Sequence, residues 1–134
     1  MPPLISVVTI CYNAKNDLEK TILSVLSQTY QDIEYIIIDG GSTDGTVDII
    51  HKYSERLFYW ISEPDKGIYD AMNKGMDRAT GSWINFMNAG DTFCDNEVIK
   101  NIFGYNDLSD YSVIYGDCYV SKLNQLQYLK ASSM

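Results

Sequence analysis

The stretch over residues 36–46 (Ile-Ile-Ile-Asp-Gly-Gly-Ser-Thr-Asp-Gly-Thr) constrains the fold more than any other part of the sequence. Three β-branched residues in a row, without polar alternation, predict a strand covered on both faces, as in a parallel α/β sheet. At its end come Asp39, two glycines and then Ser, Thr and Asp, which are typical of turns and helix N-caps. We expect the Asp39 carboxylate to face solvent and ligand, because open α/β sheets bind ligands at the carboxyl ends of their strands. The same residues also fit a plain strand-to-helix turn.

Strands and helices are expected to alternate along the rest of the chain. The segment 17–28 has apolar residues at the i, i+4, i+7 and i+8 spacing of one buried helix face, and Asn13 or Asn16 can cap it. Strands are expected over residues 5–10, 33–39, 57–62, 83–87 and 111–119, the last pairing with part of 120–129, and helices over residues 17–28, 46–54 and 68–78 and after a cap at Asp95 or Asn96. This order predicts an α/β fold, with βαβ units forming a mostly parallel sheet flanked by helices, in one domain over residues 1–134.

The charge of the chain excludes some partners. A net charge of −8 argues against nucleic acid, because phosphate-backbone binding requires clustered Lys and Arg. An acidic chain that binds a phosphate ligand needs a local group that offsets the repulsion, such as a divalent cation, a helix N-terminus or a well-placed Lys.

No apolar run approaches the roughly 18 residues of a membrane span, and the N-terminus lacks the basic region of a signal peptide. We therefore expect a cytoplasmic protein.

The cysteines and the histidine are expected to have no chemical role. Cys11, Cys94 and Cys118 are odd in number and far apart, so they form neither a disulfide framework nor a zinc pattern. We expect each to be a reduced thiol in the core or in a loop. His51 is expected to be a solvated residue on a helix surface.

Polar residues follow each of the four expected parallel strands and should face one crevice at the carboxyl edge of the sheet. They are Tyr12 and Asn13, then Asp39, then Asp65 and Lys66, and finally the run Asn-Ala-Gly-Asp over residues 88–91. Asp39 can accept a hydrogen bond from a base or ribose, Lys66 can offset diphosphate charge, and Asp91 can hold a metal. Mg²⁺ and Mn²⁺ bind carboxylate and phosphate oxygens together, so a nucleoside diphosphate suits this set.

Five blocks in order carry a family resemblance: residues 5–13 (ISVVTICYN), 24–30 (SVLSQTY), 38–46 (IDGGSTDGT), 62–75 (SEPDKGIYDAMNKG), and 79–91, which begin with Ala-Thr-Gly and end with Asn-Ala-Gly-Asp. Together they resemble the inverting family-2 glycosyltransferases, which build capsular, colanic-acid-like and lipopolysaccharide glycans. The likeness extends from Ile5 to about Asp117. It implies a Rossmann-like GT-A nucleotide-diphospho-sugar transferase fold whose C-terminal, acceptor-binding part is truncated here.

The resemblance also implies roles for individual residues. Thr9 and Tyr12 would lie beside the nucleobase, Asp39 at the base or ribose, and Asp65, Lys66 and Asp70 around the sugar-diphosphate. Asn88 would belong to the same nucleotide-sugar site, and Asp91 would bind the metal. Gly90 departs from the family, which commonly has a carboxylate there. The implied activity is a metal-assisted, inverting transfer of a sugar, from UDP-sugar above other donors, to a glycan or lipid-linked acceptor in cell-surface polysaccharide synthesis, with Mn²⁺ or Mg²⁺ as cofactor.

The acceptor half and the usual catalytic base are expected to lie outside this sequence. Asp117, in Tyr-Gly-Asp, is the only late carboxylate in a motif-like setting and is a distant candidate for the base. We expect the 134 residues alone to bind donor with little or no transfer, and to self-associate into homo-oligomers through an exposed sheet edge. Peripheral association with the cytoplasmic face of the inner membrane is left open.

Two other functions are compatible with parts of the pattern. One is a non-catalytic domain that binds a nucleotide sugar or only a protein partner. The other is a flavodoxin-like receiver domain with Asp39 as phosphoryl acceptor. The receiver interpretation is disfavoured because no later strand end supplies the expected Thr or Ser and Lys, and because it leaves Asp91 unexplained.

Overall fold

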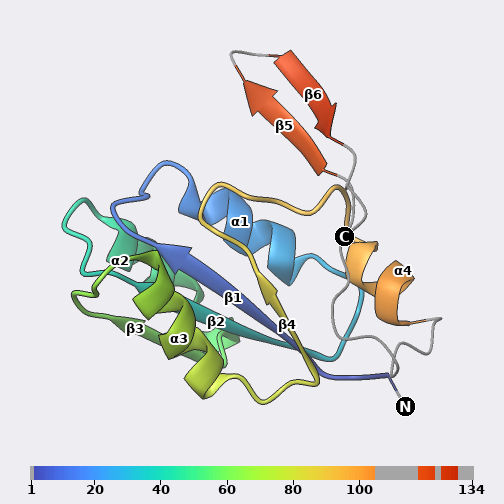
Figure 1. Cartoon of the computed structure of the whole chain (residues 1–134), viewed down its shortest axis with the longest axis horizontal. Helices are drawn as coiled ribbons and strands as arrows, with labels where there is room; N and C mark the ends of the chain where they lie inside the picture. The colour runs from blue at the N-terminus through green and yellow to red at the C-terminus, as the bar shows by residue number, and fades with distance from the viewer. Residues whose placement is uncertain (1, 105–117, 123–124, 130–134) are drawn as a thin grey trace.

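The computed structural model describes residues 2–104 in full and residues 118–122 and 125–129 as backbone strands (Figure 1). In chain order, its elements are β1 (Ile5–Cys11), α1 (Leu18–Leu26), β2 (Ile33–Asp39), α2 (Thr46–Tyr53), the 3₁₀ turn η1 (Ser54–Arg56), β3 (Tyr59–Ser62), α3 (Ile68–Arg78), β4 (Trp83–Phe86), α4 (Val98–Phe103), β5 (Cys118–Lys122) and β6 (Gln125–Leu129). None of the helices in these ranges is long and apolar enough to cross a membrane.

The central sheet has four parallel strands in the order β3-β2-β1-β4, which confirms the predicted parallel α/β arrangement. In its register, Cys11 of β1 pairs with Asp39 of β2, and Asp39 pairs with Ser62 of β3. Three strands therefore end side by side at the carboxyl edge. The expected strand over 57–62 is shorter than predicted and begins at Tyr59.

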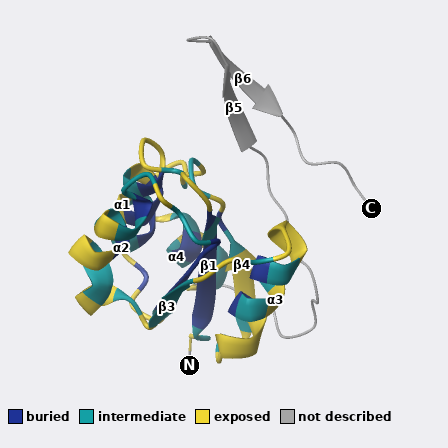
Figure 2. Ribbon diagram, turned by 90° about the vertical axis from the view of Figure 1, so that its left-hand side faces the viewer, coloured by how far each residue is buried: buried dark blue, intermediate teal, exposed yellow. Residues whose placement is uncertain are grey.

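Helices cover both faces of this sheet (Figure 2). One face packs against α1, α2 and α4 through a cluster that includes Val7, Ile37 and Ile50. The other face packs against α3 through Val8, Ile36, Ile38 and Ala71. The three consecutive isoleucines of β2 are all 0% exposed, which confirms that this strand is covered on both sides.

Close packing of α3 on β1 depends on Gly75. A Cβ at this position would lie 2.5 Å from Cγ1 of Val8, too close for any side chain to fit without movement. The glycine therefore lets the helix approach the strand closely.

The Ala-Thr-Gly block, residues 79–81, lies at the opposite, amino edge of the sheet. The Glu34 carboxylate is buried there and accepts hydrogen bonds from Ser6 Oγ (2.6 Å), Thr80 N (2.5 Å) and Thr80 Oγ1 (2.6 Å). Gly81 N donates to Ser6 Oγ at 2.9 Å, and a Cβ on Gly81 would lie 2.6 Å from that oxygen. This network fastens the start of β4 to β1 and β2, so the block has a structural role.

Both expected helix caps are wrong. Asp17, not Asn13 or Asn16, occupies the N-cap position of α1, and its side chain makes no capping hydrogen bond. Glu97 occupies that position for α4, while Asp95 Oδ1 accepts from Glu97 N at 2.8 Å just before the helix. Residue type favours Asn16 and Asn96 as caps, whereas each helix begins one residue later, after Asp17 and Glu97.

The remaining elements and side chains are placed as follows. Strands β5 and β6 pair antiparallel, with Cys118 opposite Leu129, so the strand expected over 111–119 is described only from residue 118 onward. Cys11 is a buried free thiol and Cys94 an exposed one. His51 is exposed, as predicted, and packs edge-on against Trp60 with ring centroids 4.8 Å apart.

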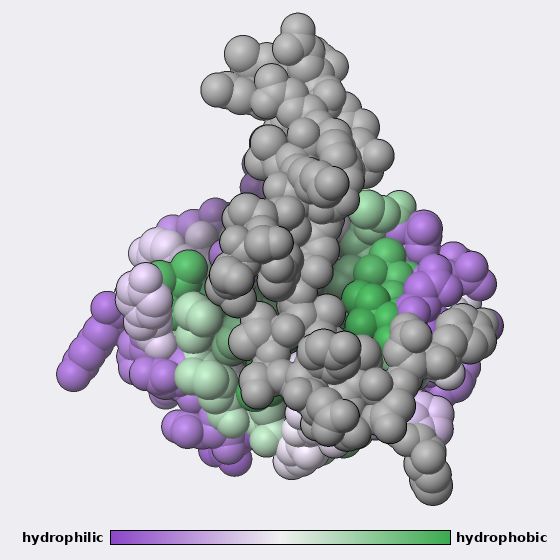
Figure 3. All heavy atoms as spheres, turned by 45° about the vertical axis from the view of Figure 1, so that its right-hand side comes forward, coloured by the Kyte–Doolittle hydropathy of each residue, from purple (hydrophilic) through white to green (hydrophobic). Residues whose placement is uncertain are grey.

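Within the described sheet, β4 is an edge strand that pairs with β1 alone. Ile84 in this strand is 40% exposed. The face shown in Figure 3 carries hydrophobic patches beside hydrophilic ones. These features are compatible with the expected self-association, which stays a prediction.

Candidate functional site

A crevice of about 500 Å³ opens at the carboxyl edge of the sheet. Its walls are residues 10–14 after β1, Asp17 at the start of α1, Asp65 with Gly67 and Ile68 at the start of α3, and Asn88 with Ala89 after β4. Three of the four predicted strand ends therefore meet in it. Of the residues assigned from the sequence, Tyr12, Asp65 and Asn88 line the crevice directly.

Asp39, the fourth strand-end residue, is 0% exposed, so the expectation that its carboxylate faces solvent is wrong. Oδ2 accepts from Gly41 N (3.1 Å), Ser42 N (2.8 Å) and Ser62 Oγ (2.7 Å), and Oδ1 accepts from Ser42 Oγ (2.5 Å) and Cys11 Sγ (3.3 Å). Burial alone would raise the pKa of Asp39, but these hydrogen bonds outweigh burial and hold the pKa below its usual value. The carboxylate thus ties β1, β3 and the glycine loop together.

Burial has the opposite net effect on the neighbouring thiol. Cys11 is buried against the Asp39 carboxylate, and desolvation together with that negative charge raises the pKa of the thiol well above its usual range. Cys11 therefore stays protonated and acts as a weak donor in the wall of the crevice.

The polar residues of the glycine loop hold the neighbouring loop after β1. The contacts run from Asn13 N to Ser42 Oγ (2.7 Å), from Thr43 N to Asn13 Oδ1 (2.9 Å), from Lys15 N to Asp44 Oδ2 (3.1 Å) and from Ala14 N to Thr46 Oγ1 (2.9 Å). Gly41 and Gly45 have φ of +88° and +104°, which only glycine adopts readily. The loop therefore fixes the wall that carries Tyr12, as the plain turn interpretation anticipated.

Asp65 and Tyr12 meet over Gly40. A Cβ on Gly40 would lie 2.9 Å from Asp65 Oδ2 and 3.3 Å from Tyr12 Cδ1. Asp65 Oδ1 accepts from Gly67 N at 3.0 Å, which leaves Oδ2 without a hydrogen-bond partner within the described residues. Tyr12 is 63% exposed. A flat aromatic surface and a carboxylate oxygen are thus presented side by side at the crevice.

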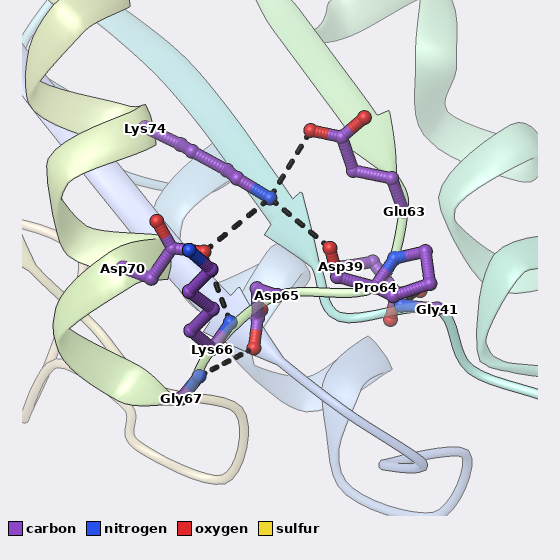
Figure 4. A network of polar contacts seen from close by, with 9 residues as sticks. All are labelled: Asp39, Gly41, Glu63, Pro64, Asp65, Lys66, Gly67, Asp70 and Lys74. Atoms are coloured by element: carbon purple, nitrogen blue, oxygen red, sulfur yellow. Dashed lines mark hydrogen bonds and ion pairs between the residues drawn. The ribbon is translucent and has the colours of Figure 1, made fainter.

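The start of α3 contains a network that the sequence did not reveal (Figure 4). Asp70 Oδ2 accepts from Lys66 N at 3.0 Å and lies 3.7 Å from Lys74 Nζ. Lys74 Nζ also lies 3.1 Å from Glu63 Oε1 and 3.4 Å from the Pro64 carbonyl oxygen. The hydrogen bond with Glu63 is the main reason that the pKa of Lys74 is raised.

Lys74 is therefore the cation of this network. The two other residues assigned to the sugar-diphosphate, Asp70 and Lys66, do not line the crevice as Asp65 does. Asp70 closes the first turn of α3 by accepting from a backbone N–H. The Lys66 side chain is exposed and lies outside the crevice walls. The structure thus brings Asp65 into the crevice and leaves Lys66 at its margin.

Asp91 lies in a tight turn after β4. Asn88 N donates to Asp91 Oδ2 (3.1 Å), and Asp91 N donates to the Asn88 carbonyl oxygen (2.9 Å). Gly90 has a φ of +104°, so a residue with a side chain would be strained at this position. The glycine that departs from the family pattern is thus required by the turn as it is built here. Asp91 itself is exposed.

A divalent cation fits this site only with oxygens from a ligand. Within residues 2–104, no three His, Cys, Asp or Glu side chains gather into a metal site. Asp91 offers Oδ1, because Oδ2 already accepts from Asn88 N, and the crevice walls add the carboxylates of Asp17 and Asp65. Such oxygens suit Mg²⁺ or Mn²⁺ when phosphate oxygens and water complete the coordination.

The described walls of the crevice carry two carboxylates and no Lys or Arg. An anionic diphosphate in this position would be repelled unless a cation accompanied it. The acidic charge of the whole chain, noted from the sequence, is therefore also the charge of the crevice.

Thr9 is not brought to the crevice. It is 0% exposed, and its Oγ1 lies 2.7 Å from the Tyr35 hydroxyl in the layer between the sheet and its helices. The two-residue alternation of a strand could have predicted this, since Thr9 shares its face of β1 with the core residues Val7 and Cys11. Asp117 lies outside the described residues.

Two residues of the site were missed by sequence reasoning. Asp17 lines the crevice, and the only signal for it in the sequence is its place at the start of the expected helix. Thr21 of α1 holds the turn of Asp91: its Oγ1 donates to the Asp91 carbonyl oxygen at 2.7 Å and accepts from Gly90 N at 2.8 Å. No spacing in the sequence indicates that contact.

Comparison with known proteins agrees with this architecture. Residues 6–134 match the family described as Glycosyl transferase family 2. An uncharacterized glycosyltransferase of Mycobacterium tuberculosis is 42% identical over 98 residues, which cover 72% of this chain and 37% of the relative. A PGL/p-HBAD biosynthesis glycosyltransferase of Mycobacterium bovis is 34% identical over 129 residues, covering 91% and 49%. Bacillus subtilis TuaG, whose name assigns it to teichuronic acid biosynthesis, is 38% identical over 103 residues, covering 75% and 41%.

Solved structures show the same fold. TarS of S. aureus aligns with a TM-score of 0.67 at 24% identity, over 74% of this chain and 18% of TarS. The mannosyltransferase PcManGT of Pyrobaculum calidifontis, in complex with GDP-Man and Mn²⁺, aligns with a TM-score of 0.66 at 23% identity, over 72% and 30%. The chain spans less than half the length of the curated relatives described above. It belongs to glycosyltransferase family 2, and residues 2–104 form the parallel α/β core of a GT-A-type fold.

Proposed function

We propose that this chain is the nucleotide-sugar-binding part of a glycosyltransferase that uses a UDP-sugar and delivers the sugar, with inversion, to a glycan or lipid-linked acceptor in cell-surface glycan synthesis. The observation that carries the proposal is the crevice at the carboxyl edge of the parallel sheet, walled by Tyr12, Asp65 and Asn88, with the turn of Asp91 beside it. Ligands of open α/β sheets bind at this edge.

The names of similar proteins support the substrate class. The M. bovis and B. subtilis relatives are named for PGL/p-HBAD biosynthesis and teichuronic acid biosynthesis. Structures of TarS 1–349 in complex with UDP and with UDP-GlcNAc align with this chain at TM-scores of 0.67. The uracil base is proposed on this ground, and the acceptor class on the names of the relatives.

The side chains are assigned roles that follow from their exposure. The exposed ring of Tyr12 would pack against the base, and Asp65 and Asn88 would contact the ribose and diphosphate. Lys66, exposed at the margin, would reach the diphosphate from outside. Thr9 and Asp39 would act from behind the wall by fixing its backbone, because both are 0% exposed. Asp70 would likewise act by holding the start of α3.

The cation would be held by Asp91 together with oxygens of the diphosphate. A Mn²⁺ or Mg²⁺ ion bound there supplies Lewis-acid stabilisation of the charge that develops on the leaving nucleoside diphosphate. The chain's own contribution is to hold one carboxylate in a rigid turn and to offer no competing basic residue in the described crevice walls.

Thermal melting with UDP and Mn²⁺ tests the proposal. UDP at about 100 times its dissociation constant should add about 2.7 kcal/mol to the free energy of unfolding, which raises the melting temperature by several degrees. The increase should disappear in EDTA, and Asp91→Asn should remove the Mn²⁺-dependent part. Asp95→Asn, an exposed carboxylate outside the crevice walls, serves as the control. No shift with UDP and Mn²⁺, or the same shift in EDTA, would contradict the proposal.

A further inference from the structure

Helix α1 and the residues just after its end carry a row of polar side chains, Thr21, Ser24 and Gln28, that contact another segment of the chain. Ser24 Oγ accepts from Phe93 N at 2.7 Å. Gln28 donates to the Asp95 carbonyl oxygen at 2.6 Å and accepts from Ile99 N at 3.2 Å. With Thr21, these residues fasten the segment between β4 and α4. These contacts give Ser24 and Gln28 of the Ser-Val-Leu-Ser-Gln-Thr block a role that the folding of α1 alone does not require.

Thr21 differs from the other two residues in what it holds. Its hydroxyl donates to the carbonyl oxygen of Asp91 and accepts from the N–H of Gly90, so it touches the backbone on both sides of the Asp91 Cα. A helical threonine often bonds a carbonyl of its own preceding turn. Here both partners lie about 70 positions away in sequence, at separations of 70 and 69.

The surroundings make this contact hard to replace. Thr21 is 0% exposed, so its hydroxyl reaches the two backbone groups from the buried side of the turn, and its removal would leave both groups without this partner. The turn is closed from within by hydrogen bonds from Asp91 N to the Asn88 carbonyl oxygen and from Asn88 N to Asp91 Oδ2, and Thr21 supplies the side-chain contacts that fasten it to α1. The orientation of the exposed Asp91 carboxylate therefore depends on the buried Thr21 hydroxyl together with the hydrogen bonds inside the turn.

We propose that Thr21 is a positioning residue: its hydroxyl fixes the backbone of Asp91, so that the carboxylate is held in the direction needed to bind a divalent cation. The inference rests on the proposed function, since it concerns the same cation and the same nucleotide. Ser24 and Gln28 anchor residues further along, and their loss should affect stability without affecting cation-dependent binding.

Titration calorimetry of the full chain with UDP, in Mn²⁺ and in EDTA, separates these roles. Thr21→Val keeps the shape and removes the hydroxyl, and it should reduce the Mn²⁺-dependent gain in UDP affinity by about 10- to 100-fold, the usual effect of losing an outer-shell partner of a metal ligand. UDP affinity in EDTA should be unchanged. Thr21→Ser, which keeps the hydroxyl, should restore the gain to within about twofold of wild type. Ser24→Ala is the matched control and should keep the full gain.

Each result has one meaning. Thr21→Val with the wild-type gain overturns the inference, and so does Ser24→Ala with an equal loss. If Thr21→Val does not fold, as judged by circular dichroism, Thr21→Cys is measured instead, because a thiol donates and accepts only weakly; a wild-type gain in that variant likewise overturns the inference. A wild-type chain that binds no UDP in either condition refutes the proposed function itself, and the inference falls with it.

Discussion

Replacing Asp39 with alanine should destabilise the protein strongly. The carboxylate accepts five hydrogen bonds inside the fold, including two from the backbone N–H groups of Gly41 and Ser42. A hydrogen bond to a charged group contributes about 1.5–3 kcal/mol, and each buried donor left unpaired costs about 1–3 kcal/mol. These values do not add, because Ser42 and Ser62 can turn toward other partners. We therefore expect a loss of about 3–5 kcal/mol, against a typical total stability of about 5–15 kcal/mol.

Asp39→Asn isolates the charge. It keeps the shape and one acceptor oxygen but places an amide N–H₂ among donors, so we expect a smaller loss of about 2–3 kcal/mol. The folded pKa of Asp39 is lowered, so the carboxylate contributes stability above its unfolded pKa of about 4, and this contribution is lost as pH falls through the lowered folded value. The asparagine variant should accordingly lose less stability than wild type as the pH falls from neutral through the unfolded pKa and on through the lowered folded pKa of Asp39.

Urea unfolding followed by tryptophan fluorescence measures both effects. The expected result is a lower midpoint with an unchanged slope, which reports a change in stability rather than in the surface exposed on unfolding. Ser62→Ala, which removes one of the five donors, should cost about 1 kcal/mol and serves as the matched control. A loss below about 1 kcal/mol for Asp39→Ala would show that the internal hydrogen bonds contribute little to the free energy of unfolding. That result would favour the expectation from the sequence that the Asp39 carboxylate faces the ligand.

Three other substitutions test separate parts of the structure. Glu34→Gln should cost about 2–3 kcal/mol in urea unfolding and leave UDP affinity unchanged, because its network lies at the amino edge, away from the crevice; a weaker UDP affinity would contradict this separation. Gly40→Ala should weaken UDP binding in calorimetry chiefly by displacing Asp65, so together with Asp65→Ala it should weaken binding by less than the sum of the two separate effects; additive effects would refute the contact. Gly75→Ala should lower stability by about 1–3 kcal/mol through overpacking against Val8, and Val8→Ala in the same chain should recover part of the loss in a melting scan; no recovery would place the strain elsewhere.

The sheet and the crevice could be predicted because they follow from patterns that are local in sequence. The run Ile36, Ile37 and Ile38 has no polar member, so only a strand covered on both faces can accommodate it, and all three are 0% exposed. The strand-end rule predicts that Tyr12 and Asp65 lie at one edge, because parallel strands share one carboxyl edge, and both residues line the crevice there.

The wrong and missing assignments depend on contacts between distant residues. Asp39 stands at the right strand end, but its burial depends on Ser62, 23 positions away, which the sequence does not indicate as a partner. Glu34 is satisfied by Thr80 across 46 positions, and Thr21 holds Asp91 across 70. A spacing rule shows which residues share a face or an edge, whereas hydrogen-bond partners across the sheet become visible only in three dimensions.

The central claim is that a nucleoside diphosphate and its cation bind at the carboxyl edge of the sheet, beside Asp91. The direct measurement is an NMR spectrum of the ¹⁵N-labelled chain with UDP and a small amount of Mn²⁺, because the paramagnetic ion broadens the amide signals nearest to it. We expect strong broadening over residues 88–91 and at Gly67, with Thr80 and Gly81 at the opposite edge unaffected. Broadening that is centred at the amino edge, or that is equal throughout the chain, would contradict the claim.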